Sequence, residues 1–207
     1  MTNVYPNIAA VVLAAGRSTR FGSDDKLLAQ INGVPMLRLV VDRVTSVGFG
    51  SVIVVVPPNA IALQKLLRQS SVQVIENNSH EEGMGSSISC AVQHISRLSL
   101  LPNGIAIFLG DMPFIETSTI ALICDEFHRR DDKFITRPCF DGIPGHPVIF
   151  PIGYRKELQQ LVNDRDAKEL VLANHSQLRS VDVDQPGATM DIDTISDRDT
   201  SEPDTPE

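Results

Sequence analysis

The sequence predicts an α/β domain in which helices cover both faces of a mainly parallel sheet, giving three layers. Short apolar runs rich in Val, Ile and Ala alternate with segments of helical periodicity through most of the 207 residues. These runs lack alternating polar positions, which is typical of parallel strands that are buried on both faces. Because ligands of such sheets bind beyond the carboxyl ends of the strands, we expect a site in the loops after the first, third and fourth strands.

The first third of the chain predicts two strands that flank one helix. The apolar run at residues 8–14 is the first buried strand, and residues 51–56 form the second. Between them, Asn32-Gly33 is a tight-turn signal, Pro35 suits a first helical position, and Gly48 ends the helix. The apolar positions that give this helix its spacing are Leu37, Val40, Val41, Val44 and Val47.

The remaining chain continues the alternation of strands and helices. Asn59 is expected to cap a helix that ends near residue 68. Further strands are predicted at residues 72–76, 105–109, 134–137 and 146–150, with short extended pieces at 178–183 and 190–192. Further helices are predicted at residues 86–98, 117–129, 153–161 and 167–174. We therefore expect one domain over residues 1–195.

Negative charge is concentrated at the end of the chain. Nine acidic residues and one arginine between residues 181 and 207 account for the whole net charge of −8, so the rest of the sequence is balanced. A balanced body without a basic stripe argues against nucleic-acid binding. Residues 196–207 contain no apolar side chain, and we expect them to form an acidic, disordered tail.

Apolar runs and cysteines bear on the location of the protein. No run of eighteen apolar residues exists, which argues against a membrane span, and the short polar N-terminus does not resemble a signal peptide. Cys90, Cys124 and Cys139 are widely spaced and form no zinc-binding pattern. We therefore expect free thiols in a reducing, cytoplasmic environment.

The loop that follows the first strand carries the strongest chemical signal. Its small residues let backbone N–H groups approach a ligand closely. Arg20 and Lys26 add positive charges that suit phosphate oxygens. The loop is therefore predicted to cradle a polyphosphate. The residues expected to face the nucleotide, besides the two cations, are Leu13, Ala14, Ala15 and Gly16.

Two better-known glycine motifs do not match this loop. The dinucleotide fingerprint GxGxxG needs a second glycine at position 18, where this chain has Ser18. The P-loop motif needs a lysine directly after its last glycine, but here Ser23 follows Gly22. The acidic residue that usually binds ribose after the second strand is also missing, because Val56 runs directly into Pro57. The cradle is therefore of another type.

The same loop resembles the signature LAAGxSxRxGxxxK of nucleotidyltransferases, and the resemblance extends over residues 13–194. Together with five further motifs in the same order, it is similar to the molybdenum cofactor cytidylyltransferases. The sequence departs from their pattern at residues 195–197, where Ile-Ser-Asp replaces Pro-Glu-Asp. The five motifs are Gly33-Val34-Pro35-Met36-Leu37, Gly83-Met84-Gly85-Ser86-Ser87-Ile88, Gly110-Asp111-Met112-Pro113, Gly142-Ile143-Pro144-Gly145-His146-Pro147-Val148-Ile149-Phe150 and Asp191-Ile192-Asp193-Thr194.

The resemblance implies a Rossmann-like nucleotide-diphospho-sugar transferase fold and a nucleotidyl transfer reaction. Both reactants of that reaction are anions, so the protein must align and neutralise them. The resemblance implies that Arg20 and Lys26 hold the triphosphate and that Asp111 ligates Mg²⁺, the expected cofactor. Asp193 is the favoured second metal ligand and Asp191 the alternative, since the local pattern does not distinguish them.

The remaining motifs would bind the nucleoside and the acceptor. For the acceptor, the resemblance implies contacts from Gly145 and His146 to its phosphate or pterin. A structural histidine in a turn is the alternative. Serine hydroxyls and free helix N–H groups would hold the base and ribose, unless this segment is only a capped helix start. The residues expected around the nucleoside are Gly83, Gly85, Ser86 and Ser87.

The first functional hypothesis is the transfer of CMP from CTP to molybdopterin-bound molybdenum cofactor, with release of pyrophosphate. CTP is favoured because related guanylyltransferases resemble LAGG where this chain has Ala15. One alternative is a guanylyltransferase, and another is a nucleotidyltransferase for a sugar or alditol phosphate. A third is an NAD(P)H-dependent oxidoreductase or a cofactor-binding protein that retains the fold. A molybdoenzyme or its chaperone would be a further partner.

Overall fold

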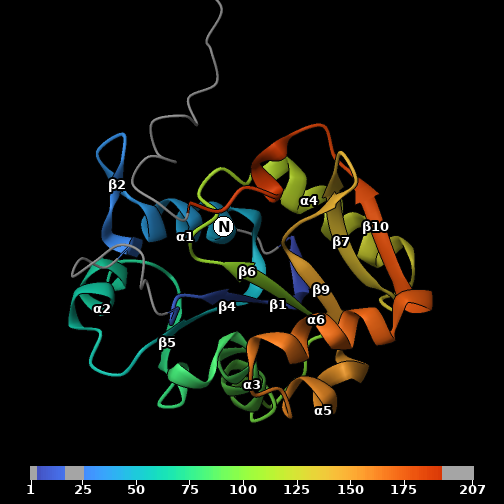
Figure 1. Cartoon of the computed structure of the whole chain (residues 1–207), viewed down its shortest axis with the longest axis horizontal. Coiled ribbons are helices and arrows are strands. Elements are labelled where there is room, and N and C mark those ends of the chain that lie inside the picture. Colours follow the sequence, from blue (N-terminus) through green and yellow to red (C-terminus); the bar gives the residue numbers. More distant parts are fainter. Residues whose placement is uncertain (1–3, 17–25, 193–207) are drawn as a thin grey trace, which may run out of the picture.

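The computed structural model describes residues 4–16 and 26–192 (Figure 1). Arg20, Asp193 and residues 196–207 lie outside the described residues, so the predictions made for them stay predictions. Within the described part of the chain, helices cover both faces of an eight-stranded sheet, which confirms the predicted three-layer α/β class. The strand order is β10-β7-β9-β6-β1-β4-β5, and β8 pairs with β7.

Four parallel strands form one half of the sheet. β1 lies between β4 and β6 and pairs with both, so that Val11 lies opposite Ile53 and Ile107. β5 adds to the outer side of β4. All four strands were predicted from their apolar runs, with bounds that differ by three residues or fewer. The strands are β1 (Tyr5–Leu13), β4 (Phe49–Val56), β5 (Gln73–Glu76) and β6 (Gly104–Leu109).

The other half of the sheet contains a reversed strand. β9 (Val148–Pro151) runs antiparallel to both β6 and β7 (Ile135–Phe140). β10 (Leu178–Asp182) pairs in parallel with β7, and β8 (Ile143–Pro144) pairs antiparallel with it. Most central pairings are therefore parallel, as predicted. The extended piece predicted at 190–192 is not part of a strand.

Alternate residues of the central strands enter two separate hydrophobic clusters. In β1, Ala10 and Val12 face one cluster, whereas Ala9 and Val11 face the other. This alternation explains the continuous apolar run, because neither face of the strand meets water. The first cluster packs against α1 (Met36–Val47), α2 (Ile61–Leu67) and α4 (Thr117–Arg129). The second packs against α3 (Met84–Ile95), α5 (Arg155–Leu158) and α6 (Asp164–Ala173).

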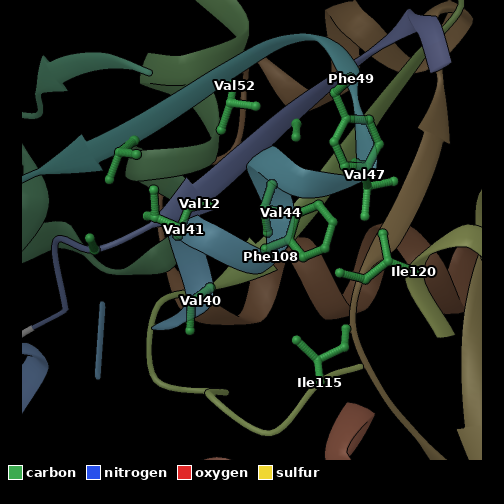
Figure 2. Close-up of a cluster of buried hydrophobic side chains, with 14 of the residues drawn as sticks. Val12, Val40, Val41, Val44, Val47, Phe49, Val52, Phe108, Ile115 and Ile120 are labelled. Atoms are coloured by element: carbon green, nitrogen blue, oxygen red, sulfur yellow. The ribbon is translucent and has the colours of Figure 1, made fainter. Parts of the chain in front are cut away.

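The valine stripe of α1 forms the centre of the first cluster. Figure 2 shows Val40, Val41 and Val44 lying against Val12 of β1 and Phe108 of β6. All five side chains are fully buried or nearly so. Burial of each stabilises the fold by about 1.5–3 kcal/mol relative to exposure. The predicted helical spacing is therefore the reason that α1 is fixed on the sheet.

Turns and helix ends match the sequence in two places and differ in two. Pro35 was expected in the first helical position, but α1 begins at Met36 and Pro35 precedes it. Asn32 and Gly33 have φ of 50° and 79° and form the predicted turn, between β2 (Gln30–Ile31) and β3 (Val34–Pro35). Gly48 ends α1 with φ of 85°, a left-handed conformation that suits glycine. The prediction that Asn59 caps α2 is wrong, because Ala60 precedes the helix and no side-chain cap bond forms.

Five short 3₁₀ helices complete the described elements. Three of them bear on the site described below, namely η1 (Lys26–Leu28), η2 (His80–Glu82) and η5 (Pro186–Ala188). The other two are η3 (Ile152–Tyr154) and η4 (His175–Gln177). No helix of residues 4–16 and 26–192 combines the length and the apolar character needed to cross a bilayer.

Candidate active site

A cavity of about 350 Å³ opens beyond the carboxyl ends of the central strands. Its volume lies within the range of small-molecule sites, roughly 300–1,000 Å³. Three segments that follow β1, β5 and β6 form its walls, as the rule for parallel sheets predicts. The lining residues are Leu13, Ala15, Gly16, His80, Glu81, Glu82, Gly83, Met84, Ser87, Leu109 and Asp111.

Lys26 and Asp111 form an ion pair at this cavity. Lys26 Nζ lies 2.8 Å from Asp111 Oδ2, a short charge-assisted hydrogen bond. The Lys26 side chain is only 9% exposed and the Asp111 side chain 26% exposed. η1 carries the lysine, and the aspartate is the second residue after β6. Two residues predicted to act together are therefore brought into contact, although the sequence separates them by 85 positions.

The carboxylate of Asp111 is a group that binds hard divalent cations such as Mg²⁺. No group of three or more His, Cys, Asp or Glu residues within 4–16 and 26–192 could enclose a metal. Magnesium does not need such a cage, since it binds through one or two carboxylates, phosphate oxygens and water. Asp191 is exposed and lies near enough to His146 for its charge to affect that histidine. The favoured second ligand, Asp193, lies outside the described residues.

A buried amide organises the start of α3. Asn77 Nδ2 donates to Ser86 Oγ at 2.9 Å and to Ser87 Oγ at 3.0 Å. The Ser86 hydroxyl in turn lies 2.8 Å from the carbonyl oxygens of both Ser79 and Gly83. Its proton is therefore directed to the backbone, which differs from the expectation that this hydroxyl donates to a nucleoside. Ser87 lines the cavity, whereas Ser86 does not.

Gly85 packs against another part of the backbone rather than against the cavity. A Cβ atom at this position would lie 2.4 Å from the carbonyl oxygen of Asn163. The residue is buried and is not among those that line the cavity. Glycine therefore permits a close approach between α3 and the loop before α6, and the predicted contact of Gly85 with the nucleotide stays a prediction.

His146 is held in one tautomer by a backbone carbonyl. Its Nδ1 lies 3.2 Å from the carbonyl oxygen of Ile107, and because a carbonyl only accepts, Nδ1 carries the proton. Burial lowers the pKa of His146, while the Ile107 carbonyl and the charges of Asp111 and Asp191 oppose that shift. The imidazole is therefore neutral near pH 7 and Nε2 is a hydrogen-bond acceptor.

Residues 186–192, here called the C-terminal strap, hold the two loops of the site together. The backbone N–H of His146 donates to the carbonyl of Ala188 at 2.8 Å. The backbone N–H of Ile192 donates to the carbonyl of Asp111 at 3.0 Å. Ala188 and Ile192 are each 1% exposed, which anchors the strap in the hydrophobic core. A Cβ at Gly145 would lie 2.1 Å from the Ala188 carbonyl oxygen. The predicted acceptor loop is thus fixed by close backbone contact.

The structure adds residues to the site that the sequence did not identify. His80, Glu81 and Glu82 line the cavity. Their place in the chain was a usable signal, because they follow strand β5 at its carboxyl end. The C-terminal strap acts through contacts with residues far away in the sequence, which no local pattern reveals. Asn77 contacts Ser86 and Ser87, nine and ten positions away.

The sequence model of one protein family, described as the MobA-like NTP transferase domain, matches residues 10–179. The bifunctional protein GlmU of Zymomonas mobilis is 30% identical over 166 residues, which are 78% of this chain and 36% of that protein. The molybdenum cofactor guanylyltransferase of Yersinia pestis is 40% identical over 74 residues, 36% of this chain and 35% of that protein. The matched segment of this chain therefore spans about a third of the length of each of these curated relatives.

Solved structures show the same fold. The crystal structure of Rv0371c from Mycobacterium tuberculosis has a TM-score of 0.79 and 28% sequence identity, covering 92% of this chain and 95% of that one. A complex of Rv0371c with manganese has a TM-score of 0.70 and 26% identity, covering 86% and 89%. The mainly parallel α/β fold expected from the resemblance is confirmed.

Proposed function

We propose, from the premise that the chain belongs to the MobA-like NTP transferase domain family, that this nucleotidyltransferase moves CMP from CTP to a phosphorylated pterin, the molybdenum cofactor. The observation that carries the proposal is the contact between Lys26 and Asp111 at the cavity beyond β1 and β6. A cation and a carboxylate at one point supply the two charges that a metal–triphosphate complex needs.

The reaction would be an in-line displacement at the α-phosphorus of CTP. An oxygen of the acceptor phosphate forms a new bond to that phosphorus, and the bond to the bridging oxygen of pyrophosphate breaks. Asp111 would hold Mg²⁺, with Asp193 or Asp191 as a second carboxylate; when bound, the ion offsets charge on the phosphate oxygens. Lys26 and Arg20 would bind the triphosphate, and the backbone at Ala15 and Gly16 would lie beside it.

The nucleoside would lie against the wall formed by Gly83 and Ser87, away from Lys26 and Asp111. Ala15 lines the cavity with only 3% of its surface exposed, so its methyl group narrows the space that a glycine would leave. This supports a pyrimidine over a purine, and hence CTP over GTP. The guanylyltransferase of Yersinia pestis keeps GTP as the second candidate.

The acceptor would lie near Gly145 and His146. The Nε2 atom of a neutral imidazole accepts hydrogen bonds, so it suits an N–H donor of a pterin better than an anionic phosphate oxygen. We place the reaction in the cytoplasm, in keeping with the free thiols of Cys90, Cys124 and Cys139. A molybdoenzyme or its chaperone would receive the product.

Product analysis tests this function. The protein would be incubated with Mg²⁺, molybdenum cofactor and either α-labelled CTP or α-labelled GTP, and the products would be identified by mass. We expect a labelled CMP adduct of the cofactor and pyrophosphate, and loss of both with Asp111→Asn. A GMP adduct would overturn the base assignment, and turnover only with a sugar or alditol phosphate would overturn the acceptor. Hydride transfer from NADPH without nucleotidyl transfer would overturn the reaction class.

A further inference from the structure

The ion pair between Lys26 and Asp111 uses one oxygen, Oδ2, of the carboxylate that the proposed metal would bind. Lys26 Nζ lies 2.8 Å from Asp111 Oδ2, and the residue as a whole is 7% exposed. A magnesium or manganese ion bound to the same oxygen would lie about 2.1 Å from it. The ammonium and the divalent ion would then be close neighbours of like charge. Each would therefore weaken the binding of the other to Asp111.

We propose that Lys26 is an internal counter-ion that opposes metal binding to Asp111 until a triphosphate arrives, so that metal and triphosphate bind interdependently. This inference rests on the proposed function, because it takes the triphosphate as the group that receives Lys26. The polyphosphate supplies the negative oxygens that the ammonium requires when the metal takes its place on Asp111.

Burial of Lys26 is the reason that this exchange is coupled. Lys26 is buried, so water screens its repulsion of a metal that arrives alone only weakly, and this repulsion opposes metal binding. A triphosphate that arrives alone would meet a lysine that is already neutralised by Asp111. Each ligand therefore removes an obstacle to the other, which is positive coupling between their affinities.

The direct test is the affinity of Mn²⁺ alone, measured by electron paramagnetic resonance without any nucleotide. We expect Lys26→Met to bind Mn²⁺ roughly tenfold more tightly than the unmodified protein, because a repelling charge next to the ligand is gone. The same change should weaken CTP binding, so one substitution moves the two affinities in opposite directions. Lys26→Arg keeps the charge and should leave Mn²⁺ binding weak. Asp111→Asn in the Lys26→Met background should remove the gain.

Lys133→Met is the matched control. It also removes a lysine paired with an aspartate, at 3.3 Å from Asp131, but both side chains are largely exposed and lie outside the cavity. It changes the net charge equally and should leave Mn²⁺ affinity unchanged within about twofold. If it tightened Mn²⁺ binding as much as Lys26→Met, a general charge effect would replace our explanation.

A second measurement separates failure of this inference from failure of the proposed function. Mn²⁺ affinity would be measured with and without a non-hydrolysable CTP analogue, with correction for the metal that binds the analogue in solution. We expect a gain with the unmodified protein and a smaller gain with Lys26→Met. Equal or weaker Mn²⁺ binding by both Lys26→Met and Lys26→Gln would overturn the counter-ion, even if CTP binds. Absence of all nucleotide binding would overturn the proposed function. The comparison of Mn²⁺ affinities without nucleotide would still test whether Lys26 opposes metal binding to Asp111.

Discussion

Substitution of Gly187 by alanine tests whether the C-terminal strap positions the site. A Cβ atom here would lie 2.1 Å from the carbonyl oxygen of Phe114 and 2.6 Å from its carbonyl carbon, both backbone atoms. Gly187 has no left-handed φ, so lack of space is the obstacle rather than conformation. An acceptable contact requires a shift of about 1 Å between the strap and the loop that follows Asp111.

The cost of Gly187→Ala follows from this overlap. Overpacking of a rigid contact costs about 1–3 kcal/mol of the free energy of unfolding, and each kcal/mol lowers the melting temperature of a chain this size by about 2–4 °C. The Ile192 N–H, 3.0 Å from the carbonyl of Asp111, would move with the strap. Because a 1 Å misplacement can reduce a rate about 100-fold, we expect kcat to fall by more than the loss of folded protein explains.

Thermal melting and steady-state kinetics on the same samples check this prediction, with Gly153→Ala as the matched control. A Cβ at Gly153 would meet no atom within 4 Å, so that variant should melt within about 2 °C of the unmodified protein and keep its rate. If Gly187→Ala melted and turned over like Gly153→Ala, the strap would not position the site and our reasoning would be refuted.

Two further substitutions test the buried amide and the histidine. Asn77→Ala removes three hydrogen bonds, namely those from Nδ2 to Ser86 and Ser87 and that from the Ser79 backbone N–H to Oδ1, so it should cost about 1–3 kcal/mol in urea unfolding. The exposed Asn103→Ala should cost under about 0.5 kcal/mol. Burial lowers the pKa of His146 in the folded state. At a pH below about 6.5, the ordinary pKa of histidine, the unfolded state therefore binds a proton more readily than the folded state. Stability should therefore fall as pH drops below about 6.5, and less steeply in His146→Gln; identical slopes would contradict this role.

The central strands could be predicted from the sequence because burial on both faces leaves a visible mark. The run from Ile8 to Leu13 contains no polar residue, and the two clusters it enters account for each position. The direction of β9 could not be predicted in the same way. A buried strand has the same residue pattern in either direction, and only the pairing of Ile149 with Ala106 and Thr136 shows the reversal.

The site could be predicted only where motif and geometry coincide. Lys26 and Asp111 were expected to bind one ligand, and Lys26 Nζ lies 2.8 Å from Asp111 Oδ2. Their direct pairing depends on the tertiary fold, which brings η1 to the loop after β6. Ser86 was expected to face the nucleoside, yet its hydroxyl satisfies nearby carbonyls because Asn77 occupies its other side. The C-terminal strap escaped prediction because its role lies in long-range backbone contacts.

The most direct test of the account is a thermal shift assay with Mg²⁺ and CTP, GTP, ATP, UTP or NADPH at equal concentration. A ligand at a hundred times its dissociation constant stabilises a protein by about 2.7 kcal/mol, which is about 5–10 °C for a chain of this length. We predict the largest shift with CTP, dependent on Mg²⁺ and lost in Asp111→Asn. A GTP-selective shift would contradict the base assignment, and a shift with NADPH alone would contradict the nucleoside triphosphate site.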